Sequence, residues 1–445
     1  MLILHLLIAI LIILVLILKY KFSPVIALAL GALYYGIATG LGPVESAGLI
    51  ASGFGNTMTG IGLVVGFGCI VGQLLADSGG IHAIVKAILN TFPPHRTPEA
   101  LTAAGLVVST PVFFDVAFVI MSPMAKALAK VANMPRVIMA IALYLGTGAA
   151  HMLIPPTPGP LAVAETLGVP LGQMILYGAL LAVPTCYISL WLYKRLIARP
   201  GFWNPEEDEE QVEGQDGEYV APDKMPSLGL SLLPVMVPVV LIILGSIAPY
   251  IATEGTSFDT FVRFVGNKNV AMLIGALLAM VVAATTLDGK ELSRSVNSSL
   301  TSAGTVLLIT GAGGSLGAVL GATNIGKVIA DSMASYSIPV IVLAWLIGAL
   351  IRVAQGSGTV ALVTTANLMA PVLAELSPGY AIWVALAICS GAAFGGHVND
   401  SGFWIVTRLS GISVKGGLKM YTLNGSISAF IRLAVLLVAS AIFMR

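Results

Sequence analysis

Charged residues are scarce in this chain of 445 residues. Asp, Glu, Lys and Arg make up 10% of the sequence, whereas soluble globular domains carry about 25%. Hydrophobic residues make up 57%, and the mean hydropathy is +0.96. This composition excludes an ordinary soluble domain and indicates a chain that crosses a membrane several times. The net charge of +1 gives no electrostatic basis for binding nucleic acid.

Cysteine and catalytic motifs are also scarce. Cys69, Cys186 and Cys389 lie far apart in apolar segments, so neither a disulfide framework nor a metal site is expected. The sequence has no HExxH motif, no GxSxG at a sharp elbow and no paired acids at motif spacing, which argues against an intramembrane enzyme. We therefore expect no cofactor and no bound metal.

Hydrophobic segments long enough to cross a bilayer recur along the chain. The first, LILHLLIAILIILVLIL, lacks a basic region before it and a small-residue cleavage site, so we interpret it as a retained helix. Spans are predicted near residues 2–18, 24–41, 60–76, 137–165 and 170–193, and again near 228–250, 268–286, 303–321, 380–407 and 420–443. Each set also contains one segment that fits a simple crossing poorly, at 101–125 and at 338–372.

An acidic segment at 199–227, punctuated by Pro and Gly, is predicted to be a solvated linker between two parts of the chain. The parts on either side, 1–198 and 228–445, look like copies of each other. Gly-Ala-Leu, GFGCIVG and Gly-Ala-Ala in the first part have counterparts in the same order in the second, at 31–33 and 275–277, at 66–72 and 311–317, and at 148–150 and 391–393. Three colinear matches at nearly one offset indicate a duplicated fold.

The loops that carry Lys and Arg predict that the second copy is inverted in the membrane. Such loops tend to be cytoplasmic, and basic residues flank 101–125 on both sides, which predicts a re-entrant hairpin. Five crossings and one hairpin per copy then place both termini outside and the linker in the cytoplasm. Arg263, Lys268 and Lys327 are exceptions, because this topology places them on the outer side. Inverted repeats are common in secondary transporters.

Two spans are interrupted at corresponding places, TGAAHMLIPPTPG at 147–159 and SGAAFGGHVNDSG at 390–402. A Pro-Pro pair cannot continue the first helix, and His397, Asn399 and Asp400 are costly within a bilayer. A simple proline kink would explain the first break alone. Unsatisfied backbone at membrane depth persists only when it is buried in protein or lines a watery cavity, so we predict that both breaks line one central site.

The two hairpin tips and the two breaks supply the candidate substrate-binding residues. They are Ser109, Thr110, Asp115, His151, Thr157, Arg352, Gln355, Ser357, Thr359, His397, Asn399, Asp400 and Ser401. The Ser and Thr hydroxyls can donate to substrate oxygens at a hairpin tip, although in membrane helices they often bond to their own backbone.

The charged candidates have two interpretations each. Arg352 either binds a substrate carboxylate through its bidentate guanidinium group or forms one half of a structural ion pair. Asp400, followed by Asp115, is a candidate carrier of a proton or cation, and either acid could instead be structural. His397 and His151 could shuttle protons or donate hydrogen bonds between helices.

Four segments resemble the gluconate permease family, the gluconate:proton symporters. They are TPVFFDVAFVI at 110–120, LITGAGGSLG at 308–317, RVAQGSGTVA at 352–361 and GHVNDSGFW at 396–404. The resemblance extends over essentially the whole chain, and the family is placed in the ion transporter superfamily. It implies an all-α polytopic membrane protein of the elevator type, in which a scaffold holds a moving domain of hairpins and broken helices. It also implies a homodimer in the inner (cytoplasmic) membrane of a bacterium.

The function that this resemblance implies is proton-coupled uptake of gluconate or a related small hydroxy or sugar acid. Two features depart from the family pattern: Asp115 stands where members commonly have Glu, and the compact PPTPGP run at 155–160 favours a smaller acid. Family members also take D-serine, fructuronate or short hydroxy acids, so glycerate, 3-hydroxybutyrate and D-serine are alternative substrates. Sodium is an alternative coupling ion, and a channel is a more remote alternative function.

Overall fold

The computed structural model describes residues 1–210, 222, 224–251, 253–336 and 339–443, and this part of the chain is built from helices. The first part contains α1 (Leu2–Leu18), α2 (Pro24–Ala38), α3 (Pro43–Asp77), α4 (Gly80–Thr91), α5 (Thr97–Val108), α6 (Phe114–Val131), α7 (Arg136–Leu153), α8 (Pro158–Thr166) and α9 (Leu171–Ile197). The short helix α10 (Pro205–Asp208) lies in the linker. The second part contains α11 (Leu228–Ile251), α12 (Ser257–Val265), α13 (Lys268–Ala283), α14 (Gly289–Gly321), α15 (Ile325–Tyr336), α16 (Val340–Gln355), α17 (Gly358–Ala374), α18 (Ala381–Gly391), α19 (Ser401–Ser410), α20 (Val414–Gly417) and α21 (Asn424–Phe443).

The helices of the second part follow the same order of lengths as those of the first. A helix of 35 residues, α3, corresponds to α14 with 33 residues, and each is followed by a helix of 12 residues, α4 or α15. A helix pair joined by a short turn comes next, then a span broken in two, then a long final helix. The order of helix lengths therefore recurs in the two parts of the chain.

Six helices of the described residues are long and apolar enough to cross a membrane, or seven if the bent pair α12 and α13 counts as one span. Fewer long helices are found than spans were predicted, because the breaks divide several segments into shorter helices and because α1 and α2 have only 17 and 15 residues. The helices α4, α12 and α15 were not predicted from the sequence, because they are too short to produce a hydropathy peak of spanning length.

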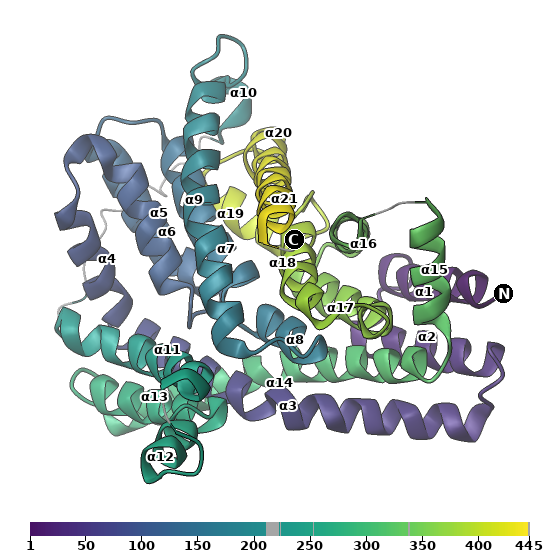
Figure 1. The fold of residues 1–445 in the computed structure, drawn as a ribbon. Helices are drawn as coiled ribbons and strands as arrows, with labels where there is room; N and C mark the ends of the chain where they lie inside the picture. The colour runs from purple at the N-terminus through teal and green to yellow at the C-terminus, as the bar shows by residue number, and fades with distance from the viewer. Residues whose placement is uncertain (211–221, 223, 252, 337–338, 444–445) are drawn as a thin grey trace.

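The two longest helices, α3 and α14, run side by side along the bottom of Figure 1 and pass beneath α8. Both begin well before the predicted spans, because their glycine- and hydroxyl-rich N-terminal halves have low hydropathy. A Cβ at Gly53 would lie 2.5 Å from the carbonyl oxygen of Gly314, so only glycine permits this close approach. The Ser315 hydroxyl also donates to the backbone oxygen of Ile50 across the helix pair.

The predicted solvated linker is partly anchored to the folded protein. Asp208 is fully buried and forms an ion pair with Lys419 at 2.5 Å. Glu207 pairs with Lys415, and Glu209 forms an isolated β-bridge with Ile412. The prediction of a fully solvated segment is therefore wrong for these residues, because the acidic side chains meet basic partners on the chain before α21. The rest of the acidic run lies outside the described residues.

Helices of the hairpins and the broken spans gather in the upper and central part of Figure 1, where α7 and α9 stand beside α18, α19 and α21. Here α16 packs on α17 and α18, and α6 packs on α7 and α19. The predicted hairpin segments and broken spans therefore come together in space, although α5 and α6 lie more than 200 residues before α16 and α17 in the sequence.

Candidate substrate site

The turn between α16 and α17 is fixed by local sequence chemistry. Gly356 ends α16 with φ +78°, a left-handed conformation that side chains rarely adopt. The Ser357 hydroxyl then caps α17 by accepting a hydrogen bond from the backbone N–H of Val360. A Cβ at Gly356 would also lie 2.3 Å from the backbone oxygen of Asn399, so this turn touches the break between α18 and α19.

The break between α18 and α19 is tied to the same turn. Asp400 caps α19 by accepting a hydrogen bond of 2.9 Å from the Gly402 N–H. The Asn399 amide donates to the carbonyl oxygens of Val353 and Ala354, at 2.9 and 3.2 Å, in the last turn of α16. Asn399 therefore satisfies carbonyls at the end of one half-helix, and Asp400 satisfies an N–H at the start of another.

Arg352 and Asp400 form a buried ion pair that joins the second hairpin to the second break. The Tyr421 hydroxyl donates to the same carboxylate oxygen, and a guanidinium nitrogen of Arg352 lies 3.3 Å from the Tyr421 hydroxyl. Another guanidinium nitrogen donates to the Gly356 oxygen at 3.0 Å. Of the two interpretations of Arg352, this geometry favours the structural pair, because Asp400 already compensates its charge.

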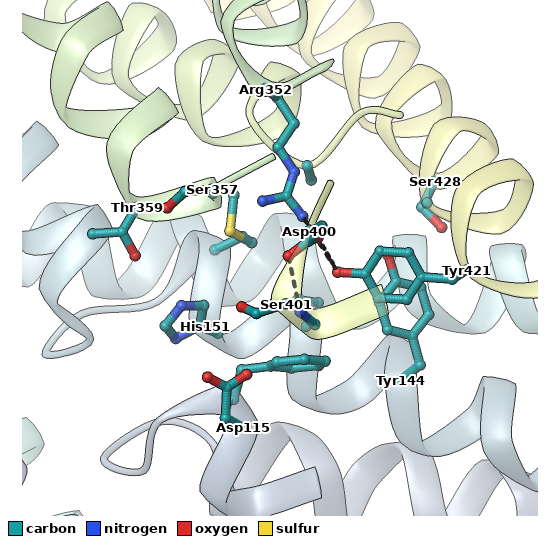
Figure 2. A pocket seen from close by; sticks show the side chains of 18 of the residues that line it. Asp115, Tyr144, His151, Arg352, Ser357, Thr359, Asp400, Ser401, Tyr421 and Ser428 are labelled. Atoms are coloured by element: carbon teal, nitrogen blue, oxygen red, sulfur yellow. Dashed lines mark hydrogen bonds and ion pairs between the residues drawn. The ribbon is translucent and has the colours of Figure 1, made fainter. Parts of the chain in front are cut away.

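A cavity of about 230 Å³ opens beside this network, and Figure 2 shows it at close range. Its walls include the first turns of α6, α17 and α19, which present Asp115, Thr359 and Ser401. Helix N-termini carry unpaired N–H groups and partial positive charge, so three such ends around one cavity favour an anion. Ligand cavities for drug-sized molecules measure about 300–1,000 Å³, so this one suits a small molecule.

The predicted substrate-binding residues divide between the cavity wall and positions behind it. Those that line the cavity are Asp115, His151, Arg352, Ser357, Thr359, Asp400 and Ser401. Those that the structure places outside the lining are Ser109, Thr110, Thr157, Gln355, His397 and Asn399. The Thr110 and Thr157 hydroxyls donate to carbonyls of their own segments, those of Leu106 and Ile154. The single donor of each hydroxyl is therefore occupied by a local hydrogen bond, as is common for Thr in membrane helices.

Four polar residues of the cavity wall were missed by the sequence analysis: Tyr144, Tyr421, Ser428 and Arg432. The ring centroids of Tyr144 and Tyr421 lie 4.6 Å apart with the rings tilted by 38°, and Figure 2 shows both side chains at one side of the cavity. Arg432 had a visible signal, because it is the only charged residue of the apolar helix α21. The tyrosines had none, because only packing between α7 and the segment before α21 brings them together.

A polytopic helical protein with a charged cavity at the meeting point of broken helices belongs to the class of membrane transport proteins. Comparison with known proteins agrees with this class. The sequence matches the model of the GntP family permeases over residues 1–442. It therefore belongs to the GntP permease family, whose members are transporters and not enzymes.

Alignments with known relatives cover nearly the whole chain. An uncharacterized permease of Haemophilus influenzae is 34% identical over 92% of this chain and 86% of that protein. A gluconate permease of Pseudomonas aeruginosa is 32% identical over 99% of this chain and 98% of that protein.

A solved structure shares the fold. The YdaH transporter of Alcanivorax borkumensis superimposes with a TM-score of 0.62, over 91% of this chain and 90% of that chain. The sequence identity is 14%, so this likeness concerns the fold alone.

Proposed function

We propose that this protein is a secondary active transporter that takes up gluconate, or a related small hydroxy or sugar acid, together with a proton across the inner membrane. The observation that carries the proposal is the small cavity walled by three helix N-termini, hydroxyl groups and buried arginines. Hydroxyls can bond to the hydroxyls of such an acid, and the positive groups can compensate its carboxylate. The gluconate permease among the relatives supports the same substrate class.

The proton carrier that we propose is Asp115 rather than Asp400. Asp115 is exposed in the first turn of α6 and lines the cavity, and within the described residues it forms no ion pair. Asp400 is buried against Arg352, and protonating it would leave that guanidinium without a counterion. His397 lies outside the cavity lining, which makes it a weaker candidate for coupling than Asp115.

Uptake into liposomes tests the transport and the coupling together. The purified protein is reconstituted, the voltage is clamped with valinomycin and potassium, and entry of radiolabelled gluconate is followed with an alkaline interior. Symport of a monoanion with one proton is electroneutral, so accumulation should follow the pH gradient and not the voltage. Equilibration without accumulation would instead indicate a channel, and accumulation driven by a sodium gradient alone would replace the proton by sodium.

Two matched variants separate coupling from binding. Asp115→Asn should keep the exchange of gluconate between equal pools but lose uptake driven by the pH gradient. Asp115→Glu, which keeps a carboxylate at this position, should keep both. Normal pH-driven accumulation by Asp115→Asn would rule out Asp115 as the carrier.

The substrate itself is tested by competition. Unlabelled gluconate, glycerate, lactate, 3-hydroxybutyrate and D-serine are each added against labelled gluconate in the exchange assay. Gluconate should compete best if the cavity is matched to a sugar acid. Stronger competition by glycerate or lactate would assign a shorter hydroxy acid, in agreement with the compact PPTPGP run at 155–160.

The remaining features of the proposal concern movement and assembly. We propose that 1–198 and 228–445 are inverted repeats joined by the linker 199–227, with the two helix pairs entering as re-entrant hairpins. In this proposal α3 and α14 belong to a scaffold, and the broken helices move against it as an elevator. A homodimer with external termini would complete the arrangement. The recurring order of helix lengths supports the two repeats, and the close α3–α14 pair supports their assignment to one scaffold.

A further inference from the structure

Arg432 differs from the other buried arginine of the cavity in having no counterion. It lies near the middle of α21 and is 3% exposed. Within the described residues, no carboxylate lies within ion-pair distance of its guanidinium, and its Nε has no hydrogen-bond partner. Its polar neighbour on α9 is the thiol of Cys186, which donates to the Leu145 carbonyl. A thiol is a weak partner and cannot neutralise a guanidinium.

Other buried polar groups without partners occur on the same face of α21. Asn424, Ser428 and Arg432 follow one another at intervals of four residues, so their side chains share one helix face. Asn424 is fully buried, and neither its amide oxygen nor its amide nitrogen has a partner among the described residues. The Ser428 hydroxyl is likewise buried and unpartnered, and Figure 2 shows it beside the cavity. Ser428 and Arg432 both line the cavity.

A buried guanidinium of this kind is expensive to maintain. Arginine stays protonated in proteins, and an uncompensated buried ion costs several kcal/mol in desolvation. A structural role would be expected to come with a carboxylate partner, as Arg352 has with Asp400. The absence of such a partner in a cavity wall indicates that Arg432 is kept for an anion that enters the cavity.

We propose that Arg432 binds the carboxylate of the transported acid, with Ser428 as a neighbouring donor, whereas Arg352 holds the hairpin and the break together. This inference rests on the proposed function and adds which residue recognises the charge. The substrate then lies with its carboxylate toward α21 and its hydroxyls toward Ser357 and Thr359 on α17, which line the same cavity. Arg432 thereby discriminates acids from neutral polyols.

The discrimination can be measured with a matched pair of ligands. Gluconate and glucitol share one carbon chain, but glucitol has an uncharged CH₂OH group in place of the carboxylate. Inhibition constants of both are determined in the gluconate exchange assay at zero pH gradient, for the native protein, Arg432→Gln, Arg432→Lys and the exposed control Arg408→Gln. Binding of gluconate to Arg432→Gln should weaken by at least about thirtyfold, which corresponds to the roughly 2 kcal/mol lower bound for breaking a buried charged pair.

The pattern across the variants decides the assignment. Affinity for glucitol should stay within about threefold in Arg432→Gln, Arg432→Lys should recover part of the affinity for gluconate, and Arg408→Gln should behave as the native protein. Unchanged preference for gluconate in Arg432→Gln would overturn the role of Arg432 while leaving the transporter function intact. Failure of the native protein to bind any of the tested acids would instead overturn the proposed function.

Stability without substrate gives a second, independent readout. Removing a buried cation that has no counterion relieves its desolvation cost, so Arg432→Gln should melt at or above the temperature of the native protein. Arg352→Gln should melt lower, because it leaves the Asp400 carboxylate buried without its partner. A large loss of melting temperature in Arg432→Gln, equal to that in Arg352→Gln, would show that Arg432 is structural.

Discussion

Replacing Asp400 with Asn removes one charge of the buried pair with Arg352 while preserving the size of the side chain. Asn is as good a helix cap as Asp, so the hydrogen bond from the Gly402 N–H to the cap of α19 should survive. The amide nitrogen then stands in place of the carboxylate oxygen that accepts from Tyr421, so the Tyr421 hydroxyl can only accept a hydrogen bond from it. The variant also loses the charge that compensates Arg352, a residue that is only 7% exposed.

The magnitude follows from this burial. Breaking a buried ion pair by removing one partner costs about 3–5 kcal/mol, because the other charge remains in a low-dielectric site without compensation. We therefore expect Asp400→Asn to lower the free energy of unfolding by about that amount. The double variant Arg352→Met/Asp400→Asn removes both charges and should recover at least about 2 kcal/mol relative to the sum of the single variants.

The assay is a double-mutant cycle on the purified protein in detergent micelles. Unfolding free energies of the native protein, both single variants and the double variant are measured by denaturant titration, with Asp77→Asn as a control outside the cavity. Additivity of the two single effects within about 0.5 kcal/mol would refute the reasoning, because residues that do not interact behave additively.

Three further outcomes are expected. Gly356→Ala should destabilise the protein by more than about 1–2 kcal/mol, the cost of a left-handed backbone for a residue with a side chain, because the backbone oxygen of Asn399 also lies 2.3 Å from the new Cβ. Gly62→Ala, whose Cβ meets open space, should not destabilise the protein, and equal melting temperatures of the two variants would contradict this expectation. Glu165→Gln breaks a partly exposed ion pair with Lys268 between α8 and α13, so it should change the free energy of unfolding by less than about 1 kcal/mol. The same variant should alter the rate of gluconate exchange if α8 moves against α13, and an unchanged rate would argue against that movement. Cysteines placed in the acidic run 206–218 should resist an impermeant reagent added outside intact cells, and ready labelling would reverse the proposed orientation.

Several features of the fold depend on short-range chemistry and could be predicted from the sequence. The scarcity of charge and the long apolar runs predict membrane helices, because an unpaired backbone group is not tolerated in lipid. The Pro-Pro pair marks the end of α7, and the N-caps Ser357 and Asp400 mark the starts of α17 and α19. Each of these signals acts within a few residues, so a single segment suffices to show it.

Only the tertiary structure determines which residues that are distant in sequence form ion pairs. Arg352 lies 48 residues before Asp400 and could equally have faced a substrate; the packing of α16 against the second break gives it a counterion. Arg432, in the apolar helix α21, has no carboxylate within ion-pair distance among the described residues. Composition thus determined that buried charges exist in this protein, but only the arrangement of helices determined which charge is compensated, because an ion pair requires contact in space and not proximity in sequence.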